Sequence, residues 1–119
     1  MYGLPPDFDP TIIVGRRLQQ VSFTANTVHL SFDEDLSITL ESTFEHRFGS
    51  DSVQLEMGSI PVAESRLMQL IDKSIKSAQI EDSGTLLLDF GDRHTLRCVD
   101  DSLQYESYRI KYGDREIVV

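Results

Sequence analysis

Tyrosine and carboxylate side chains gather in the last part of the sequence. Three of the four tyrosines, Tyr105, Tyr108 and Tyr112, fall within eight residues, with Glu106 and Asp114 close by. Phenol and carboxylate groups at this density can hydrogen-bond a ligand or line a protein interface. The stretch also alternates as a β-strand does, which places Tyr108 in a core. For Tyr105 and Tyr112 both interpretations stay open, and we assign them with Glu106 to a candidate partner-binding surface.

The three histidines, His29, His46 and His94, show no metal-ligand spacing. None belongs to a His-x-x-x-His pair, and one cysteine cannot form a Cys-x-x-Cys motif. We therefore expect neither a metal nor a cofactor. His46 follows Phe44 in the stretch TFEHRF, and we add these two residues to the candidate partner-binding surface.

No arrangement of nucleophile, base and phosphate-binding loop stands out. Cys98 falls on the apolar face of an expected strand, where a free cysteine behaves as a small hydrophobic residue. The acidic turn at 33–35 lacks the glycine and glutamate that mark a calcium-binding loop. We predict that the protein is not an enzyme. The alternative is a small hydrolase or ligand-binding enzyme that uses turn carboxylates with His46 or His94.

Acidic residues outnumber basic ones by 20 to 11, which gives a net charge of −9 and a pI near 4.6. This balance disfavours nucleic-acid binding, because phosphate contacts need a basic face. It suits either simple solubility or the attraction of a basic protein partner. The apolar runs are too short to span a membrane, and the first ten residues do not resemble a secretory signal. With a single cysteine, these features predict a cytoplasmic protein.

Two segments of the chain alternate in the same way, about 57 to 60 residues apart. Each reads as a three-stranded meander, and their apolar positions match: Val28, Leu30 and Phe32 with Leu86, Leu88 and Phe90, then Leu36 and Ile38 with Leu96 and Cys98. Between them, apolar residues at helical spacing predict one main helix at about 61–73. A further strand is expected at Val53 to Met57.

The expected fold is α+β and mainly antiparallel β, with two pseudo-repeated meanders around one shared core. Each meander has too few strands to be stable alone, so the halves at about 9–58 and 59–119 should form a single domain, 1–119. Residues 1–8, with Gly3, Pro5 and Pro6, read as an extended arm. The tail around Tyr108 would follow the second meander as TFEHRF follows the first.

The second half carries a resemblance to a known family. The stretch LIDKSIKSAQIEDSGTLLLDFGDRHTL, followed by YESYRI and GDREIVV, resembles a family of short uncharacterised bacterial proteins. Its members typically show a Phe-x-Asp-Gly turn and a C-terminal Tyr-Glu-x-aromatic motif. Here Phe90-Gly91-Asp92 replaces that turn, and Tyr108 stands where tryptophan is common. The resemblance implies no catalytic residues, and the small acidic form is similar to immunity proteins that neutralise bacterial toxins.

These features predict a non-enzymatic protein-binding domain whose partner is another, basic protein. A toxin-neutralising immunity role is the sharpest form of this hypothesis. A homo-oligomeric structural or adaptor domain is a further alternative, in which the tail strand pairs across a two-fold axis as a homodimer.

Overall fold

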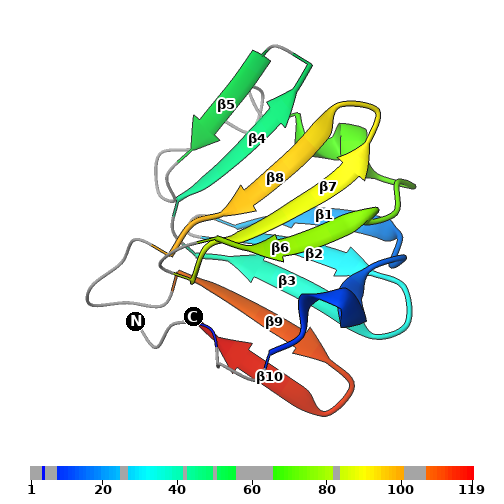
Figure 1. Cartoon of the computed structure of the whole chain (residues 1–119), viewed down its shortest axis with the longest axis vertical. Coiled ribbons are helices and arrows are strands. Elements are labelled where there is room, and N and C mark those ends of the chain that lie inside the picture. The colour runs from blue at the N-terminus through cyan, green and yellow to red at the C-terminus, as the bar shows by residue number, and fades with distance from the viewer. Residues whose placement is uncertain are drawn as a thin grey trace.

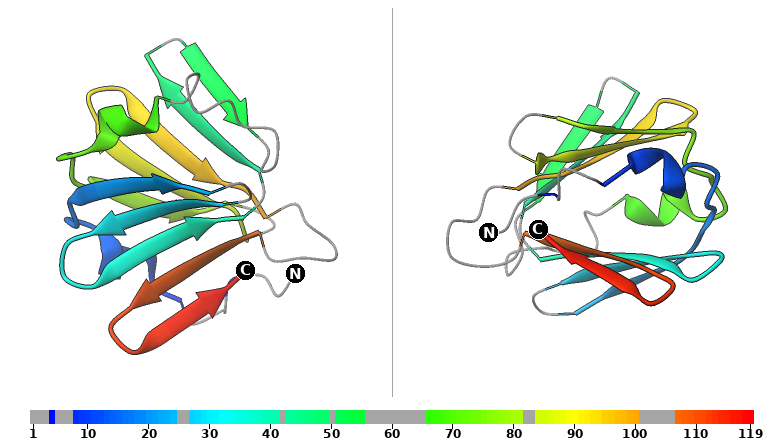
Figure 2. Two further views of the ribbon diagram at one scale, coloured as in Figure 1. Left: turned by 180° about the vertical axis from the view of Figure 1, so that it is seen from behind. Right: turned by 60° about the horizontal axis from the view of Figure 1, so that its bottom comes forward.

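In the computed structural model, two antiparallel five-stranded sheets pack face to face (Figures 1 and 2). The structure describes residues 4, 8–24, 27–41, 43–49, 66–81, 84–100 and 107–119, and the backbone of 51–55. In chain order its elements are η1 (Pro10–Ile13), β1 (Leu18–Phe23), β2 (Val28–Phe32), β3 (Leu36–Leu40), β4 (Phe44–Phe48), β5 (Asp51–Leu55), η3 (Leu67–Leu70), β6 (Ser77–Ile80), β7 (Leu86–Gly91), β8 (His94–Cys98), β9 (Tyr108–Tyr112) and β10 (Arg115–Val118).

The two halves of the chain exchange their hairpins. The first sheet has the strand order β1-β2-β3-β9-β10, and the second has the order β5-β4-β8-β7-β6. Each sheet therefore consists of a meander from one half and a hairpin from the other half. Figure 1 shows the exchange by colour, since orange β9, with red β10 beyond it, lies beside cyan β3, and green β4 lies beside orange β8. The two predicted meanders are confirmed, as is the equivalence of TFEHRF and the tail strand.

A short antiparallel bridge joins the halves near a pseudo-two-fold axis. Arg17 and Ser74 face each other across it, and they are 57 residues apart. The backbone hydrogen bonds around the bridge come in pairs whose residues are also related by 57 positions. The bond from Gly15 N–H to Ile75 O (2.8 Å) is matched by the bond from Asp72 N–H to Leu18 O (2.7 Å). The bond from Leu18 N–H to Lys73 O (2.9 Å) is matched by the bond from Ile75 N–H to Arg16 O (2.9 Å). The predicted duplication is thus present in the backbone.

One hydrophobic core fills the space between the sheets. The strands contribute alternate residues, as in the buried–intermediate–buried pattern of β2 and β3. Phe32 and Phe90, which the duplication predicts as equivalents, stack across the core with ring centroids 6.3 Å apart. The turns η1 and η3 lie between the layers at one end (Figure 2, right), where Ile13, Leu67 and Leu70 are buried.

The predicted main helix at about 61–73 is wrong. The part that is described forms only η3, a single 3-10 turn, and its chain becomes extended at Ile71. Asp72 then takes a left-handed conformation (φ 75°), as Gly15 does (φ 91°) after η1. Every described residue in a helical conformation belongs to a 3-10 turn. The fold is therefore mainly antiparallel β rather than α+β. Residues 61–65 and Met57 lie outside the described residues.

The strand pairing also corrects the predicted alignment of β8. Leu88 lies opposite Leu96, as Leu30 lies opposite Ile38. Ile38 is therefore equivalent to Leu96, and Cys98 is equivalent to Leu40 rather than to Ile38. The offset between the copies is then 58 residues on both strands, so the turn of the second copy is not longer than that of the first. The corrected alignment makes His94 the counterpart of Leu36.

Candidate functional site

Two of the three histidines meet, although they are 48 residues apart in the chain. His46 lies on β4 and His94 begins β8, and the exchange of hairpins makes these strands neighbours. His46 Nε2 and His94 Nδ1 are 3.1 Å apart, with ring centroids 5.3 Å apart. These distances fit an N–H···N hydrogen bond between rings that approach through their nitrogens. Phe48 packs beside both rings, with its ring centroid 5.1 Å from that of His46 and 6.3 Å from that of His94.

Burial sets the protonation of this pair. His46 is only 1% exposed, and burial, followed by the neighbouring His94, lowers its pKa to about 4. Burial and the charge of Lys73 also lower the pKa of His94, against an opposing effect of Asp92. Both rings are therefore neutral at pH 7.

The remaining nitrogen of His46 has no hydrogen-bond partner within the described part of the chain. His46 Nδ1 is buried, and no described residue pairs with it. If His46 donates through Nε2, then Nδ1 is an unprotonated acceptor; the opposite arrangement leaves a buried N–H unpaired. Orphaned buried N–H groups are rarer than under-satisfied acceptors, which favours donation from His46 to His94.

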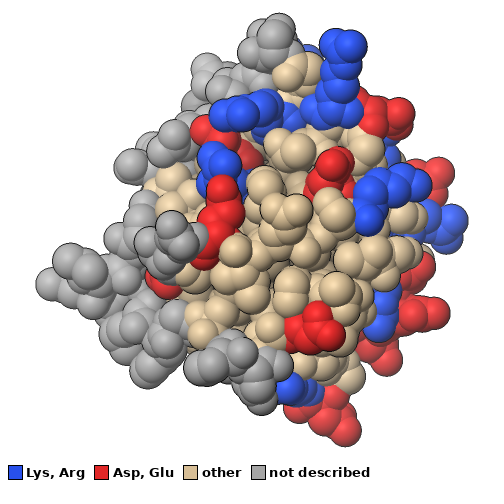
Figure 3. Space-filling model, viewed as in Figure 1, with Lys and Arg blue, Asp and Glu red and all other residues tan. Residues whose placement is uncertain are grey.

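Basic side chains gather around the histidine pair. The Arg66 guanidinium lies 6.0 Å from the centre of the Phe48 ring, and Lys73 forms an ion pair with Asp92 at 2.7 Å. Arg93 belongs to the same β7–β8 turn. Figure 3 shows basic groups toward this end of the outer face of the second sheet, while the acids and bases alternate across its middle. This corner is locally basic in an acidic protein.

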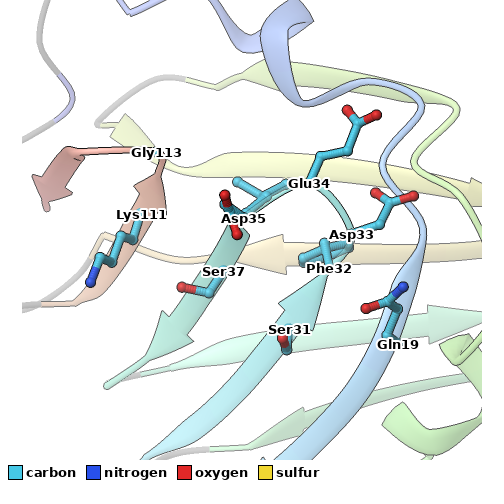
Figure 4. Close-up of a pocket in the computed structure, with 10 residues that line it drawn as sticks. Gln19, Ser31, Phe32, Asp33, Glu34, Asp35, Ser37, Lys111 and Gly113 are labelled. Carbon is cyan, nitrogen blue, oxygen red and sulfur yellow. The ribbon is translucent and has the colours of Figure 1, made fainter.

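A shallow polar hollow of about 570 Å³ lies on the outer face of the first sheet. The acidic β2–β3 turn, Asp33 to Asp35, forms one wall (Figure 4). Polar groups of neighbouring strands form the floor and the opposite wall: Gln19, Ser31, Ser37 and Lys111. The hollow can accept a cationic group at its acidic wall, with hydroxyl and amide groups beneath it.

Hydrogen bonds fix the acidic turn in place. The Arg17 N–H donates to Asp33 Oδ1 at 3.1 Å, and Asp33 N–H donates to Arg17 O at 3.0 Å. The Arg16 guanidinium donates to Glu34 O at 2.8 Å and lies 3.4 Å from the Glu34 carboxylate. Glu34 and Asp35 have φ of 55° and 63°, a left-handed pair that suits a tight hairpin. The carboxylates of the turn are thus held by a rigid backbone.

No three histidine, cysteine or carboxylate side chains group closely enough for a metal ion within the described parts of the chain. The described residues also contain no helix that is long and apolar enough to cross a membrane. His29 forms a hydrogen bond with Thr39, and His46 forms one with His94. The carboxylate–histidine contact expected of the enzyme alternative does not form among these residues.

Comparison with protein families gives one result. A family model matches residues 10–119. The chain belongs to DUF6188, a family of unknown function. No curated protein and no solved structure matches it. For this DUF6188 chain, the predicted membership of a family of uncharacterised proteins is confirmed, while the bacterial origin and the proposed motifs stay predictions.

The DUF6188 fold separates the residues of the candidate partner-binding surface. Phe44 and His46 are buried, at 0% and 1% exposure, so neither side chain reaches the surface. Tyr112 is partly buried against the core, with the Arg115 guanidinium 5.9 Å from its ring centre. Tyr105 and Glu106 lie outside the described residues. The role of these five residues in partner binding stays a prediction.

The core assignments in the tail and at Cys98 are confirmed. Tyr108 is fully buried, and its hydroxyl donates to Gly84 O at 2.5 Å. Burial raises the pKa of Tyr108 and raises that of Cys98 to about 12. The histidine pair and the hollow were missed. The alternation of Phe44, His46 and Phe48 was a signal for the burial of His46, because it gives these residues one common face.

Proposed function

We propose that the chain is a non-catalytic, cytoplasmic domain that binds another protein through the acidic hollow. A lysine or arginine side chain of the partner would enter beside Asp33, Glu34 and Asp35. The observation that carries this proposal is the hollow itself, whose acidic wall is already fixed by Arg16 and Arg17. A wall that is ordered before binding does not lose conformational entropy when the partner arrives.

The charges of the chain support a basic partner. The net charge of −9 accelerates the approach of a cationic surface, and the turn carboxylates would then orient it. The floor of the hollow offers hydroxyls on Ser31 and Ser37, which can accept hydrogen bonds from a guanidinium or ammonium group. Lys111 on the opposite wall disfavours a cation there and so restricts it to the acidic side.

A toxin-neutralising role is the specific form of the proposal. A small acidic domain can cover a basic active site of a toxin without chemistry of its own. Co-expression with the product of a neighbouring toxin gene should then protect cells and yield a complex that co-purifies. Loss of both results, with both proteins expressed, would contradict the toxin-neutralising role.

Charge removal at the hollow tests the binding site. We expect Glu34→Gln with Asp35→Asn to weaken the complex about 10-fold at physiological salt, and less at high salt, where the charges are screened. The matched control is Asp9→Asn with Asp89→Asn, which removes two charges elsewhere and keeps oxygens that accept backbone N–H groups. Equal weakening by both variants would show that only net charge matters and would contradict a site in the hollow.

A further inference from the structure

The duplication supplies an internal comparison for the histidine pair. His46 on β4 lies opposite Leu96, and Ile110 on β9 lies opposite the equivalent Ile38. His94 is likewise the counterpart of Leu36, since these residues lie opposite Phe48 and Tyr112. The corner that holds two imidazoles in the second sheet therefore holds isoleucine and leucine in the first.

This replacement makes one corner dependent on protonation. Ile110 is fully buried and has no polar group to satisfy. His46 is equally buried, yet its Nδ1 has no partner among the described residues. A buried imidazole is tolerated while it is neutral, and it becomes costly when it takes up a proton without a counter-ion.

The charged groups that the structure describes around the pair do not provide that counter-ion. His46 contacts His94 on the neighbouring strand β8 and Phe48 on its own strand β4. The Arg66 guanidinium lies over the Phe48 ring. Next to His94 are Lys73 and Asp92, which pair with each other at 2.7 Å. No described carboxylate forms a hydrogen bond or an ion pair with either ring. A proton on His46 would therefore face His94 and a locally basic corner.

The pair is positioned to control one hairpin. Strand β5 is an edge strand that pairs only with β4 in the described sheet, so the β4–β8 ladder attaches the whole β4–β5 hairpin. The histidines lie toward the Phe48–His94 end of this ladder, while Phe44 is buried at the Cys98 end. Loss of the histidine contact would loosen the end that carries the hairpin turn first.

We propose that the His46–His94 pair is an acid-sensitive latch, which holds the β4–β5 hairpin while both rings are neutral and releases its Phe48 end when they take up protons. A proton on His94 Nδ1 removes the lone pair that accepts the bond from His46. The Nε2–H of His46 and the new Nδ1–H of His94 then face each other, and a second proton, taken up at His46 Nδ1, adds a buried positive charge. The β9–β10 hairpin, with Ile110 and Leu36 at the same place, keeps its attachment.

The direction of the effect follows from proton linkage. The His46 pKa is about 4 in the closed state and 6.5 when the ring is exposed. The stabilisation is therefore complete above pH 6.5 and is lost as the pH falls toward 4. For these two values, the ratio of open to closed hairpin rises about 30-fold between pH 7.5 and pH 5.

Amide hydrogen exchange tests the latch in the full chain. After correction for intrinsic exchange, we expect the opening equilibrium of β4 amides near Phe48 to rise about 30-fold between pH 7.5 and pH 5, while β9 amides near Tyr112 change much less. The variant His46→Ile with His94→Leu, taken from the other half of the chain, should remove the difference. The control His29→Thr should retain it.

Two results would overturn the latch. One is an equal response of β4 and β9 in the unmodified chain; the other is a full response in the Ile–Leu variant. If that variant does not fold, NMR titration of the unmodified His46 ring decides. A pKa close to 4 supports a buried neutral latch, whereas a value near 6.5 rules it out.

Discussion

Phe44 of the first half lies directly opposite Cys98 of the second half, and both side chains are completely buried. The equivalent pair on the other sheet is Tyr108 opposite Leu40. Each meander is thus completed by a strand that comes from the other half of the chain. The two halves share their sheets as well as their core.

Separated halves should not fold alone. A fragment of residues 1–58 would expose the edge of β3 and the core face of β4. A fragment of residues 59–119 would likewise expose the edge of β8 and the core face of β9. We expect circular dichroism to show no cooperative unfolding for either fragment, and mixing to restore the β signal. Cooperative unfolding of one fragment as a monomer would contradict the exchange.

Removing the Tyr108 hydroxyl should destabilise the protein. Tyr108→Phe leaves Gly84 O without its donor in a partly buried environment, which costs about 1–2 kcal/mol. Urea denaturation measures the change in the free energy of unfolding. Tyr112→Phe is the matched control, because the Tyr112 side chain is partly buried and its ring contact with Arg115 does not need the hydroxyl. An equal decrease in the free energy of unfolding in both variants would mean that the Tyr108 hydrogen bond does not stabilise the fold.

The chain reversal after η1 needs a left-handed residue. Gly15 has φ 91°, and an added Cβ would meet no atom within 4 Å, so the cost of a side chain is conformational. We expect Gly15→Ala to lower the free energy of unfolding by about 1 kcal/mol. Gly15→Asn should cost less, because asparagine tolerates this region. Thermal denaturation of the two variants gives the order, and a more stable alanine variant would contradict the assigned conformation.

Cys98 should not react while the protein is folded. Its side chain is fully buried, and burial raises the thiol pKa to about 12. At pH 8 the reactive thiolate is therefore scarce as well as inaccessible. We expect a thiol-specific chromophoric reagent to label Cys98 only at the rate of unfolding, and to label it at once in denaturant. Rapid labelling of the native protein would place Cys98 outside the core.

Local alternation accounts for what the sequence predicts well. Val28, Leu30 and Phe32 alternate strictly, and their copies at 86–90 do the same, so both meanders were predictable. The apolar spacing that predicts the helix includes Leu67 and Leu70, which are buried, but their spacing of three fits a 3-10 turn as well as an α-helix. Tertiary packing selected the shorter element.

Relations between distant segments were not predictable in the same way. The alternation of apolar and polar residues does not predict that β4 pairs with β8. His46 contacts His94 only because of that pairing. The hollow likewise requires Lys111 of the second half to lie beside Ser37 of the first. Aligning TFEHRF with the tail residue by residue gives one usable signal, since it pairs His46 with Ile110 and so predicts its burial.

Cross-strand nuclear Overhauser effects test the exchange of hairpins most directly. The exchange predicts backbone contacts between Phe44 and Cys98, and between Leu40 and Tyr108. A simple continuation of the first meander would instead pair β4 with the preceding strand β3. Observation of the first two contacts supports the exchanged fold, and contacts between β3 and β4 in their place would contradict it.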